Sequence, residues 1–372
     1  MPDYRIYDLT ITTLTPVHIG TGRVLLHEYD YAIHARKTWV INQSALLDAQ
    51  KDVENLKVAE RLATIPPAQL LREPDFRPGS PFFRYVLQGQ PCSSGEGIEI
   101  QEQFKDVFDG VYLPGSGVKG ALRTVIGWQA WKELGLEPDS GRLKPRREWA
   151  GSAYEQQIFG RDPNNDFMRA LQVSDSEPRD TSCLFLLNAR VVNPGGAQSV
   201  PVEMEAIGAE SVFKSTVKLD LALFSDWAKH YRLTLAGENW LVDIPRIANA
   251  HAREILEGDI AWFKGLKNGR EVLEICERLR QAQLGPTQFL LRLGWGTGWD
   301  DKTFGARLKA DPDFMEYIIY QYRMTKGERE SGDPFPRSRR AAFRLQRTTD
   351  GSVVETPVRP LGWILVDMQA RS

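Results

Sequence analysis

The sequence predicts an α+β fold organised as two domains, and three observations lead to this prediction. The chain has 372 residues, which is enough for about two domains of ~100–200 residues each. Hydrophobic residues make up 42% of it, including ten Trp and sixteen Phe, so sizeable cores can form. Strand-like and helix-like patterns are intermixed without the regular alternation of a doubly wound sheet. We therefore expect mixed, largely antiparallel domains at residues 1–200 and 201–372.

The elements of the first hundred residues follow from local patterns. YRIYDLTITTLTP alternates apolar and polar residues as a strand does and breaks at Pro16. YDYAIHARKTWVIN predicts a hairpin that turns near residues 35–37. SALLDAQKDVENLKVAERLATI predicts one helix, capped by Ser44 and stopped by the prolines at 66 and 67. The segment from there to Asp109 is rich in Pro, Gly and Ser, and we expect a loop-rich insertion with one strand, FFRYVLQG.

The rest of the chain alternates less regularly. ALRTVIGWQAWKELG predicts an amphipathic helix, and LQVSDSEP and SCLFLLNARVV predict strands. Beyond residue 201, ESVFKSTVKLDLALF predicts a long strand, and two helices follow in IPRIANAHAREILEGDIAWFK and REVLEICERLRQAQL. TQFLLRLGWGTGWDD then runs into a glycine–tryptophan turn, and RPLGWILVDMQ predicts a terminal strand.

Composition narrows the class of protein. The net charge of −2 and the pI of about 6.3 do not indicate a strongly basic nucleic-acid binder. The three cysteines, at 92, 183 and 276, are far apart and odd in number, which excludes a zinc site made of cysteines alone. No long apolar run and no signal-peptide pattern is present, so we expect a cytoplasmic protein without a membrane span.

Arginine is nevertheless concentrated in two strips. These strips, PRSRRAAFRLQR and GRLKPRREW, contain Arg337, Arg339, Arg340, Arg344 and Arg347, and Arg142, Lys144, Arg146 and Arg147. Such strips can hold a phosphate chain on one face of an otherwise neutral protein. A scattered, solvated surface would produce the same pattern, so charge alone leaves both interpretations open.

One glycine motif, VYLPGSGVKGALRTVIGW, suggests an anion site. Gly115, Gly117 and Gly120 satisfy G-x-G-x-x-G, but neither a βαβ unit nor the acidic residue of a dinucleotide site follows. Ala121 stands where a phosphate-binding P-loop has lysine. What remains is an anion site at a helix start, flanked by Lys119 and Arg123 on one face. A tight turn with two solvated cations is the alternative.

Two further glycine turns strengthen the nucleic-acid interpretation. GWGTGWDDKTFG interleaves glycines at 294, 296, 298 and 305 with Trp295 and Trp299, and HIGTGR ends the first strand. A glycine backbone beside aromatic rings can approach a nucleic-acid strand and stack on its bases. The alternative is a turn whose tryptophans fill a core.

Together these motifs resemble the RAMP superfamily of CRISPR effector subunits. TPVHIGTG resembles its opening strand and loop, LPGSGVKGALR its most specific signature, and LQVSDSEP its V-S-D-S strand. LRLGWGTGWDDKTFG, PFPRSRR and RPLGW resemble the C-terminal half of one branch, the fifth subunit of type III-A (Csm) complexes. The resemblance implies two ferredoxin-like, RRM-related domains with loop-rich insertions.

The resemblance also implies a role and partners. It implies a crRNA-binding structural subunit that caps the effector filament at the crRNA 3′ end and supports crRNA maturation and antiviral interference. The implied partners are the 3′ region of the crRNA, the neighbouring Csm backbone RAMP subunit and host nucleases recruited in trans, with the small subunit as a further candidate. No cofactor and no metal are implied.

Candidate RNA-binding residues follow from the matched motifs. The first two motifs contribute His18, Gly20, Gly22, Gly115, Ser116, Gly117, Lys119, Gly120 and Arg123. The third contributes Gly296, Gly298 and Trp299. At position 117 relatives often have serine, so this chain lacks one hydroxyl there. Charge, rather than the resemblance, adds Arg337, Arg339 and Arg340.

An enzyme remains the rival hypothesis. His18, His27 and His34 with Lys119 could form a metal-free ribonuclease centre. We expect Asp30 to be a buried structural acid and the Asp300–Asp301 pair to be solvated. A non-catalytic subunit is therefore favoured, with a Cas6-like metal-independent endoribonuclease that processes CRISPR repeat RNA as the alternative. A nucleotide-binding enzyme built on the G-x-G-x-x-G is a third hypothesis.

Overall fold

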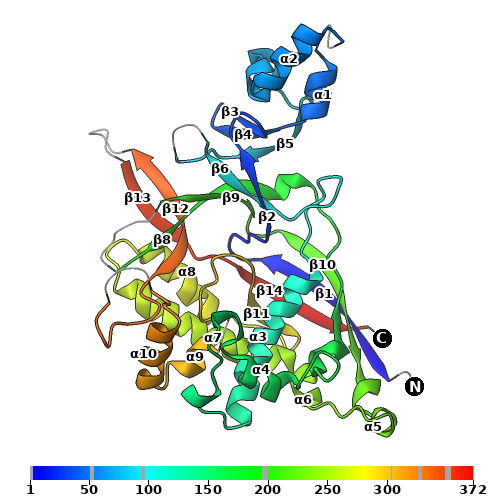
Figure 1. The fold of residues 1–372 in the computed structure, drawn as a ribbon, viewed down its shortest axis with the longest axis vertical. Coiled ribbons are helices and arrows are strands. Elements are labelled where there is room, and N and C mark those ends of the chain that lie inside the picture. The colour runs from blue at the N-terminus through cyan, green and yellow to red at the C-terminus, as the bar shows by residue number, and fades with distance from the viewer. Residues whose placement is uncertain are drawn as a thin grey trace.

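A computed structural model describes residues 3–50, 54–93, 97–194, 200–302, 304–325, 329–347 and 353–371. The fold is mixed α and β, as predicted, with two sheets and a layer of helices (Figure 1). Within these ranges, no helix has the length and apolar character that crossing a bilayer requires.

The first sheet has five strands in the order β11–β14–β1–β10–β7, and every pairing in it is antiparallel. The strands are β1 (Tyr4–Thr13), β7 (Leu171–Val173), β10 (Val212–Asp220), β11 (Gln288–Arg292) and β14 (Trp363–Ala370). The first and last long strands of the chain therefore lie side by side at its centre. The strands predicted at β1, β7, β10 and β14 are confirmed, whereas β11 lies in a run for which the sequence predicted only the turn that follows it.

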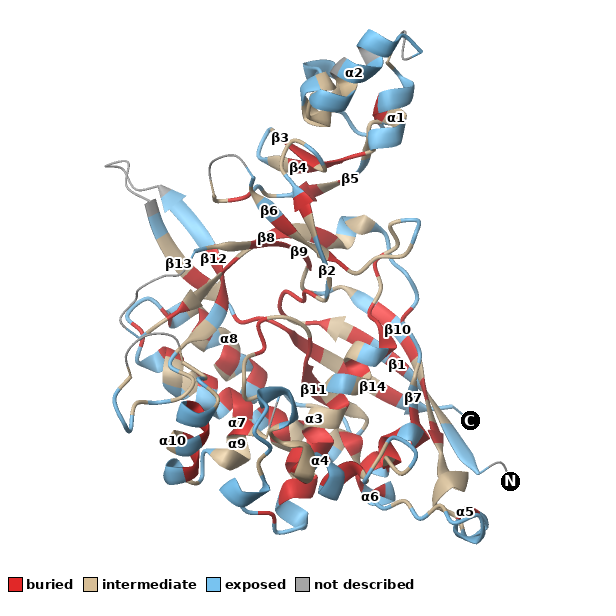
Figure 2. Cartoon of the chain, viewed as in Figure 1, coloured by how far each residue is buried: buried red, intermediate tan, exposed pale blue. Residues whose placement is uncertain are grey.

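Helices cover one face of this sheet. They are α3 (Gly115–Glu133), α4 (Ser152–Phe159), α6 (Glu238–Val242), α7 (Ile244–Lys264) and α8 (Arg270–Arg280). Leu122 and Ile126 of α3 and Ile247 of α7 are buried together with Ile11 and Phe213 of the sheet. The largest core lies in this layer, where buried side chains concentrate (Figure 2).

The second sheet lies on the side of the first sheet away from the helices (Figure 1). Its main path is β2 (Gly20–Leu26), β6 (Glu99–Gln103), β9 (Val202–Ile207), β8 (Leu184–Val192), β5 (Phe83–Gln88), β4 (Lys37–Ile41) and β3 (Tyr31–His34). The hairpin β12 (Arg339–Arg347) and β13 (Val353–Arg359) joins it through β8. Both sheets take strands from each side of residue 200, so the division into domains 1–200 and 201–372 stays a prediction.

A lobe formed by β3, β4, β5, α1 (Gln43–Asp48) and α2 (Leu56–Thr64) projects from the body (Figure 1). The predicted hairpin is confirmed, with Ala35 and Arg36 at positive φ in its turn. The single helix predicted from Ser44 is wrong, because two asparagines start separate helices. Asn42 accepts a hydrogen bond from Ala45 N, and Asn55 accepts one from Lys57 N.

Several elements had no counterpart in the sequence patterns. They include β9, β12, β13, α5 (Asp226–His230), α9 (Gly305–Leu308) and α10 (Pro312–Gln321). In β12 three consecutive residues, Ala341, Ala342 and Phe343, are buried, so no strand alternation marks the segment, and the arginines on either side made it look like a charged strip.

One buried histidine predicts a pH dependence of stability. His251 of α7 packs edge-on against Trp128 at 5.5 Å between ring centroids, and burial lowers its pKa to about 4. Since the unfolded chain binds this proton near pH 6.5, the stability is fully present above that value and is lost as the pH falls toward 4. The histidine should account for on the order of 3 kcal/mol of the fall in the free energy of unfolding between these pH values. We expect His251→Leu to lack this part of the fall when unfolding is measured by chemical denaturation at both pH values.

The exposed His230 provides a matched control. His230→Leu should retain the wild-type pH dependence of unfolding. An unchanged pH dependence in His251→Leu would contradict the assignment.

Candidate nucleic-acid interface

The three glycine motifs, far apart in the sequence, meet in space. A Cβ added at Gly294 would overlap the carbonyl oxygen of His18, and Trp295 N donates a hydrogen bond to that oxygen at 2.8 Å. A Cβ added at Gly117 would lie 3.8 Å from Ile19 Cδ1 and 3.9 Å from Leu293 Cδ1. The start of α3 therefore lies at ordinary van der Waals distance from both other motifs, whereas the close approach of Gly294 to His18 requires glycine.

The motif at 115–120 is helix rather than loop. Gly115 is the first residue of α3, and Gly117 N and Val118 N donate to the oxygen of Pro114. Gly115 N donates to Asp175 Oδ1 at 2.7 Å, so a carboxylate of the V-S-D-S segment occupies the helix end where an anion was expected. The exposed Ser116 and Gly120 are left on the outer face.

Lys119 and Arg123 share one helix face, as predicted, but differ in their partners. Both line a cavity of about 550 Å³. Arg123 donates to Asp166 Oδ2 at 2.7 Å and lies 3.6 Å over the ring of Phe159, so it already has a structural partner. In the described part of the chain Lys119 forms no ion pair, and partial burial lowers the pKa of its ammonium.

His18 is buried beneath the β1–β2 connection. Its Nδ1 lies 2.7 Å from the carbonyl oxygen of Glu205, which fixes Nδ1 as the donor. Nε2 packs against Gly20, where an added Cβ would lie 2.8 Å away, and burial lowers the pKa of the ring. His18 is therefore a structural residue here, whereas Gly20 and Gly22 are exposed.

A buried polar cluster under this connection was not apparent from the sequence. Glu205 of β9 is fully buried and accepts hydrogen bonds from Tyr85 Oη at 2.7 Å, from Gln103 N at 2.9 Å and from Lys105 Nζ. Gln103 Oε1 in turn accepts from Ile19 N at 2.9 Å, which positions the glycine turn. Three strands distant in sequence supply these groups, so no local pattern could reveal them.

In the third motif some residues pack against the protein and others face open space. An added Cβ at Gly296 would lie 2.6 Å from Leu361 Cδ1, whereas Gly298 faces open space at φ +94°. Trp299 packs edge-on against Phe335 at 5.2 Å and lies against Gly305. Its ring therefore belongs to a packed cluster, as the alternative interpretation held.

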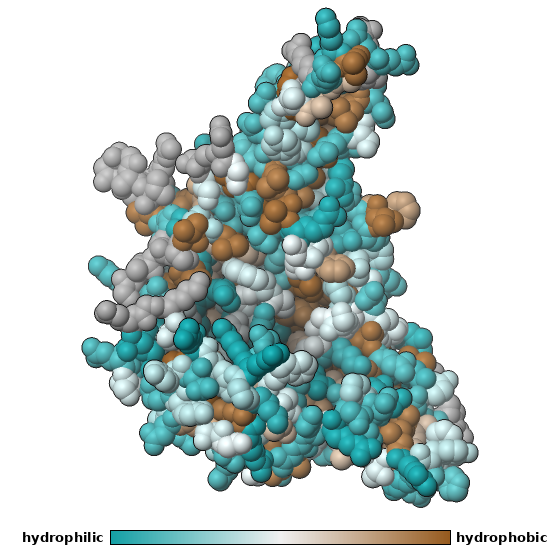
Figure 3. Space-filling view, in the orientation of Figure 1, coloured by the Kyte–Doolittle hydropathy of each residue, from teal (hydrophilic) through white to brown (hydrophobic). Residues whose placement is uncertain are grey.

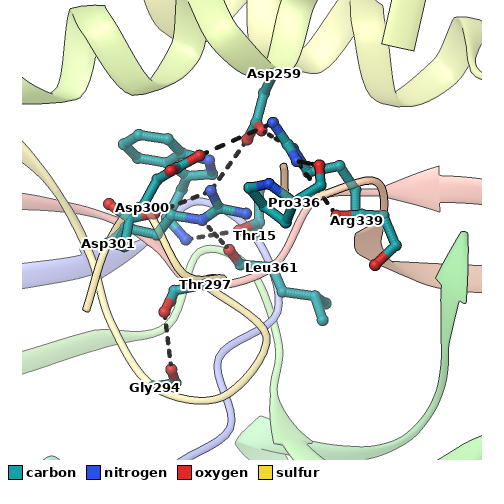
Figure 4. Close-up of polar contacts among 12 residues, drawn as sticks. Thr15, Asp259, Gly294, Thr297, Asp300, Asp301, Pro336, Arg339 and Leu361 are labelled. Carbon is teal, nitrogen blue, oxygen red and sulfur yellow. Dashed lines mark hydrogen bonds and ion pairs between the residues drawn. The ribbon is translucent and has the colours of Figure 1, made fainter. Parts of the chain in front are cut away.

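The Asp300–Asp301 pair is not solvated, contrary to expectation. Asp301 is buried and lies 3.1 Å from Arg292, which is itself buried and also paired with Asp259 at 3.0 Å (Figure 4). Burial raises the pKa of Asp301 to about 7 although Arg292 opposes the shift. The network of polar contacts around Arg292 continues to Arg339, which donates to Asp259 Oδ1 at 2.8 Å.

The C-terminal arginine strip is mostly paired internally. Arg339 is held by Asp259, Arg344 by Glu271, and Arg337 by Asp333 at 3.1 Å. Arg340 forms no ion pair within the described ranges and lies 5.0 Å from the ring centroid of Trp295. The side chain of Arg347 lies outside the described residues.

The histidines considered as catalytic groups each contact a different set of residues. His27 packs near Tyr31, while His34 stacks on Phe76 at 4.4 Å and lies 3.5 Å from Glu73. Asp30 is half-buried in a turn, where its carboxylate accepts from Leu26 N at 2.8 Å. This hydrogen bond gives Asp30 a structural role, but the expectation that Asp30 is buried is wrong, because the turn leaves its side chain partly exposed. Among the described residues, no three His, Cys, Asp or Glu side chains gather as metal ligands would.

Comparisons with known proteins agree with this geometry. Residues 10–299 match the model of the RAMP superfamily. The chain is 26% identical over 216 residues to the CRISPR system Cms protein Csm5 of Streptococcus thermophilus, an alignment that covers 50% of this chain and 55% of that protein. The chain thus matches little more than half the length of this relative.

Two solved structures share the fold. One is a chain of a Csm–crRNA–target RNA ternary complex of a type III-A CRISPR-Cas system, with a TM-score of 0.72, 21% identity, and coverage of 97% of this chain and 100% of that chain. The other is the crystal structure of T. onnurineus Csm5, with a TM-score of 0.63, 22% identity, and coverage of 95% and 99%. The whole described architecture therefore has solved counterparts.

Two glycines of one motif provide a matched test of the packing. A Cβ at Gly115 would overlap the backbone of Val173 and Ser174, whereas a Cβ at Gly120 meets nothing within 4 Å. We expect Gly115→Ala to destabilise the fold by at least about 1–3 kcal/mol. Gly120→Ala should leave stability unchanged or raise it by up to ~1 kcal/mol, because alanine favours helix.

Chemical denaturation of the two variants and the wild type measures both effects. Equal stabilities for the two variants would contradict the close packing of α3 on β7.

Proposed function

Because the chain belongs to the RAMP superfamily, we propose that it is a crRNA-binding structural subunit of a type III-A (Csm) effector complex, in the position that Csm5 holds. The observation that carries the proposal is the meeting of the three glycine motifs on one surface. Sequence similarity to Csm5 and the shared fold support it.

The RNA-facing positions of this surface are exposed or half-buried residues that form no internal ion pair in the described part of the chain. They are Gly20, Gly22, Ser116, Lys119, Gly120, Gly298 and Arg340. Exposed glycines let an RNA backbone approach closely, and a cation without an internal partner can neutralise a phosphate. His18, Gly115, Gly117 and Gly296 support this surface from beneath, while RNA contacts by Arg123, Trp299, Arg337 and Arg339 would compete with their internal partners.

We propose that the first sheet and its helices form one of the two predicted ferredoxin-like modules. The strands β14–β1–β10–β7 form an antiparallel row, with α3 between β1 and β7 in sequence and α7 and α8 between β10 and β14. This is the βαββαβ arrangement of a ferredoxin-like unit, with β11 added at the edge. A second ferredoxin-like module stays a prediction.

The wider role follows from the resemblance. The subunit would cap the filament at the crRNA 3′ end and contact the neighbouring backbone RAMP subunit, with the small subunit as a further candidate. It would support crRNA maturation by host nucleases recruited in trans. A cytoplasmic location is part of the same proposal.

A non-catalytic role is favoured over a Cas6-like endoribonuclease. The only nitrogen that His18 could use as a base packs against Gly20, and His27 and His34 contact other partners. General acid–base catalysis needs these groups within hydrogen-bond reach of one substrate atom.

Lys119 provides the direct test of RNA binding. We expect Lys119→Ala to weaken binding of the purified chain to single-stranded RNA and to reduce the slope of log K against log salt by about 0.7, the value for one phosphate contact. Filter binding or anisotropy at several salt concentrations measures both quantities.

Lys132→Ala removes the same charge from the exposed last turn of α3 and serves as control. It should leave affinity and slope nearly unchanged. Equal effects of the two substitutions would contradict the assignment of Lys119 to the RNA surface.

The non-catalytic assignment has its own test. Labelled CRISPR repeat RNA incubated with the purified chain should remain intact, with and without EDTA. Specific cleavage that His18→Ala abolishes would instead establish the endoribonuclease.

A further inference from the structure

An exposed tryptophan lies beside the RNA-facing lysine. Trp149 is 62% exposed and lines the same cavity of about 550 Å³ as Lys119. A cavity of this volume is in the range that holds a nucleotide-sized ligand. The described chain thus places an indole face and an ammonium without an ion-pair partner in one hollow.

The segment that carries Trp149 is fixed in place. Trp149 N donates to the oxygen of Arg146 at 3.0 Å, and Lys144 N donates to the oxygen of Ala150 at 3.3 Å. Tyr322 Oη, from the end of α10, donates to the oxygen of Lys144 at 2.7 Å. A backbone held in this way needs little further ordering when a ligand stacks on the ring that it carries.

Three cations that precede Trp149 closely in the sequence have no acidic partner in the described part of the chain. Lys144, Arg146 and Arg147 are exposed and form no ion pair within the described ranges. They belong to the second basic strip of the sequence, to which the proposed RNA surface gave no role.

The acids that line the cavity are in part neutralised. Asp166 is paired with Arg123, Asp162 lies 3.2 Å from Arg161, and Glu155 lies 3.6 Å from Arg123. Glu148 is the exception, since it forms no ion pair in the described chain. The cavity lining holds four cations and four acids, and after these ion pairs two cations, Lys119 and Arg169, and one acid, Glu148, have no ion-pair partner in the described chain.

We propose that this hollow binds one unpaired nucleotide of the RNA, with its base stacked on Trp149 and its phosphate at Lys119. The inference rests on the proposed function and extends it from phosphate contact to base stacking. An aromatic face flanked by cations is the arrangement that holds single-stranded nucleic acid without reading its sequence. A protein partner would need a wider apolar surface, whereas most residues that line the cavity are charged or polar. The face of the molecule shown in Figure 3 is likewise mainly hydrophilic, with scattered apolar patches.

Fluorescence quenching tests the inference on the full-length chain. Single-stranded 12-mers each carry one 2-aminopurine, at a different position in each RNA. We expect the wild type to quench one position at least about two-fold. Trp149→Ala should abolish that quenching and weaken binding roughly 5- to 100-fold, as removal of a stacking platform does. Trp149→Phe should restore part of both.

Trp227→Ala is the matched control, because Trp227 is equally exposed at 62% and lies outside the cavity. It should change neither quenching nor affinity. If Trp149→Ala binds and quenches like the wild type while Lys119→Ala still weakens binding, the stacking inference falls and the proposed function stands. If the wild type binds no RNA, the proposed function itself falls. Loss of a protein subunit from the assembled complex with RNA binding unchanged would assign Trp149 to a protein interface and overturn the inference.

Discussion

The buried guanidinium of Arg292 is the constraint on which the arrangement of the C-terminal half depends. It lies at the end of β11, forms ion pairs with Asp259 of α7 and Asp301 after the third glycine motif, and donates to the oxygen of Leu361 at 3.0 Å. The ring of Trp363 lies 5.4 Å from it. A buried charge that loses a partner costs several kcal/mol, on the order of 3–5. The helix layer, the glycine motif and the segment before β14 must therefore assemble together, because each supplies one of the partners of the Arg292 guanidinium.

The same network sets the geometry of the proposed RNA surface. Beside it, Leu293 N donates to the oxygen of Gly362 at 2.7 Å, and Gly362 N donates to the oxygen of Pro16 at 2.8 Å. Trp363 N donates to Thr15 Oγ1 at 2.9 Å (Figure 4). These bonds hold the segment before His18 against the segment before Trp295, and so bring the first and third glycine motifs together. The second motif joins them through α3. The proposed RNA surface is thus held in place by buried charge and backbone hydrogen bonds beneath it.

Local periodicity predicted much of the fold, and long-range pairing accounts for most of what it missed. The central strand β1, the β3–β4 hairpin and the helices α3, α7 and α8 each have a pattern that a short window contains. The break between α1 and α2 depends on two asparagine caps that a continuous helical pattern concealed. For the site, the motifs identified the surface, but not which members face outward. Arg339 meets an acid 80 residues away, and Glu205 gathers donors from about 100 and 120 residues away. No window of sequence contains such partners.

The roles of the glycines in the second motif follow from what each one touches. Gly115 abuts the backbone of β7, and Gly117 lies near Ile19 and Leu293. Both glycines therefore face other parts of the protein. At the N-terminal end of α3, the N–H of Gly115 donates to the carboxylate of Asp175, so a group of the chain itself occupies the place that an external anion would take. The helix dipole therefore does not select the ligand. In the proposed function, RNA contact therefore falls to the outer face of α3, where Ser116 and Gly120 are exposed and Lys119 forms no ion pair in the described part of the chain. A motif that looks like a phosphate-binding loop in sequence is, in this fold, mainly the packed start of a helix.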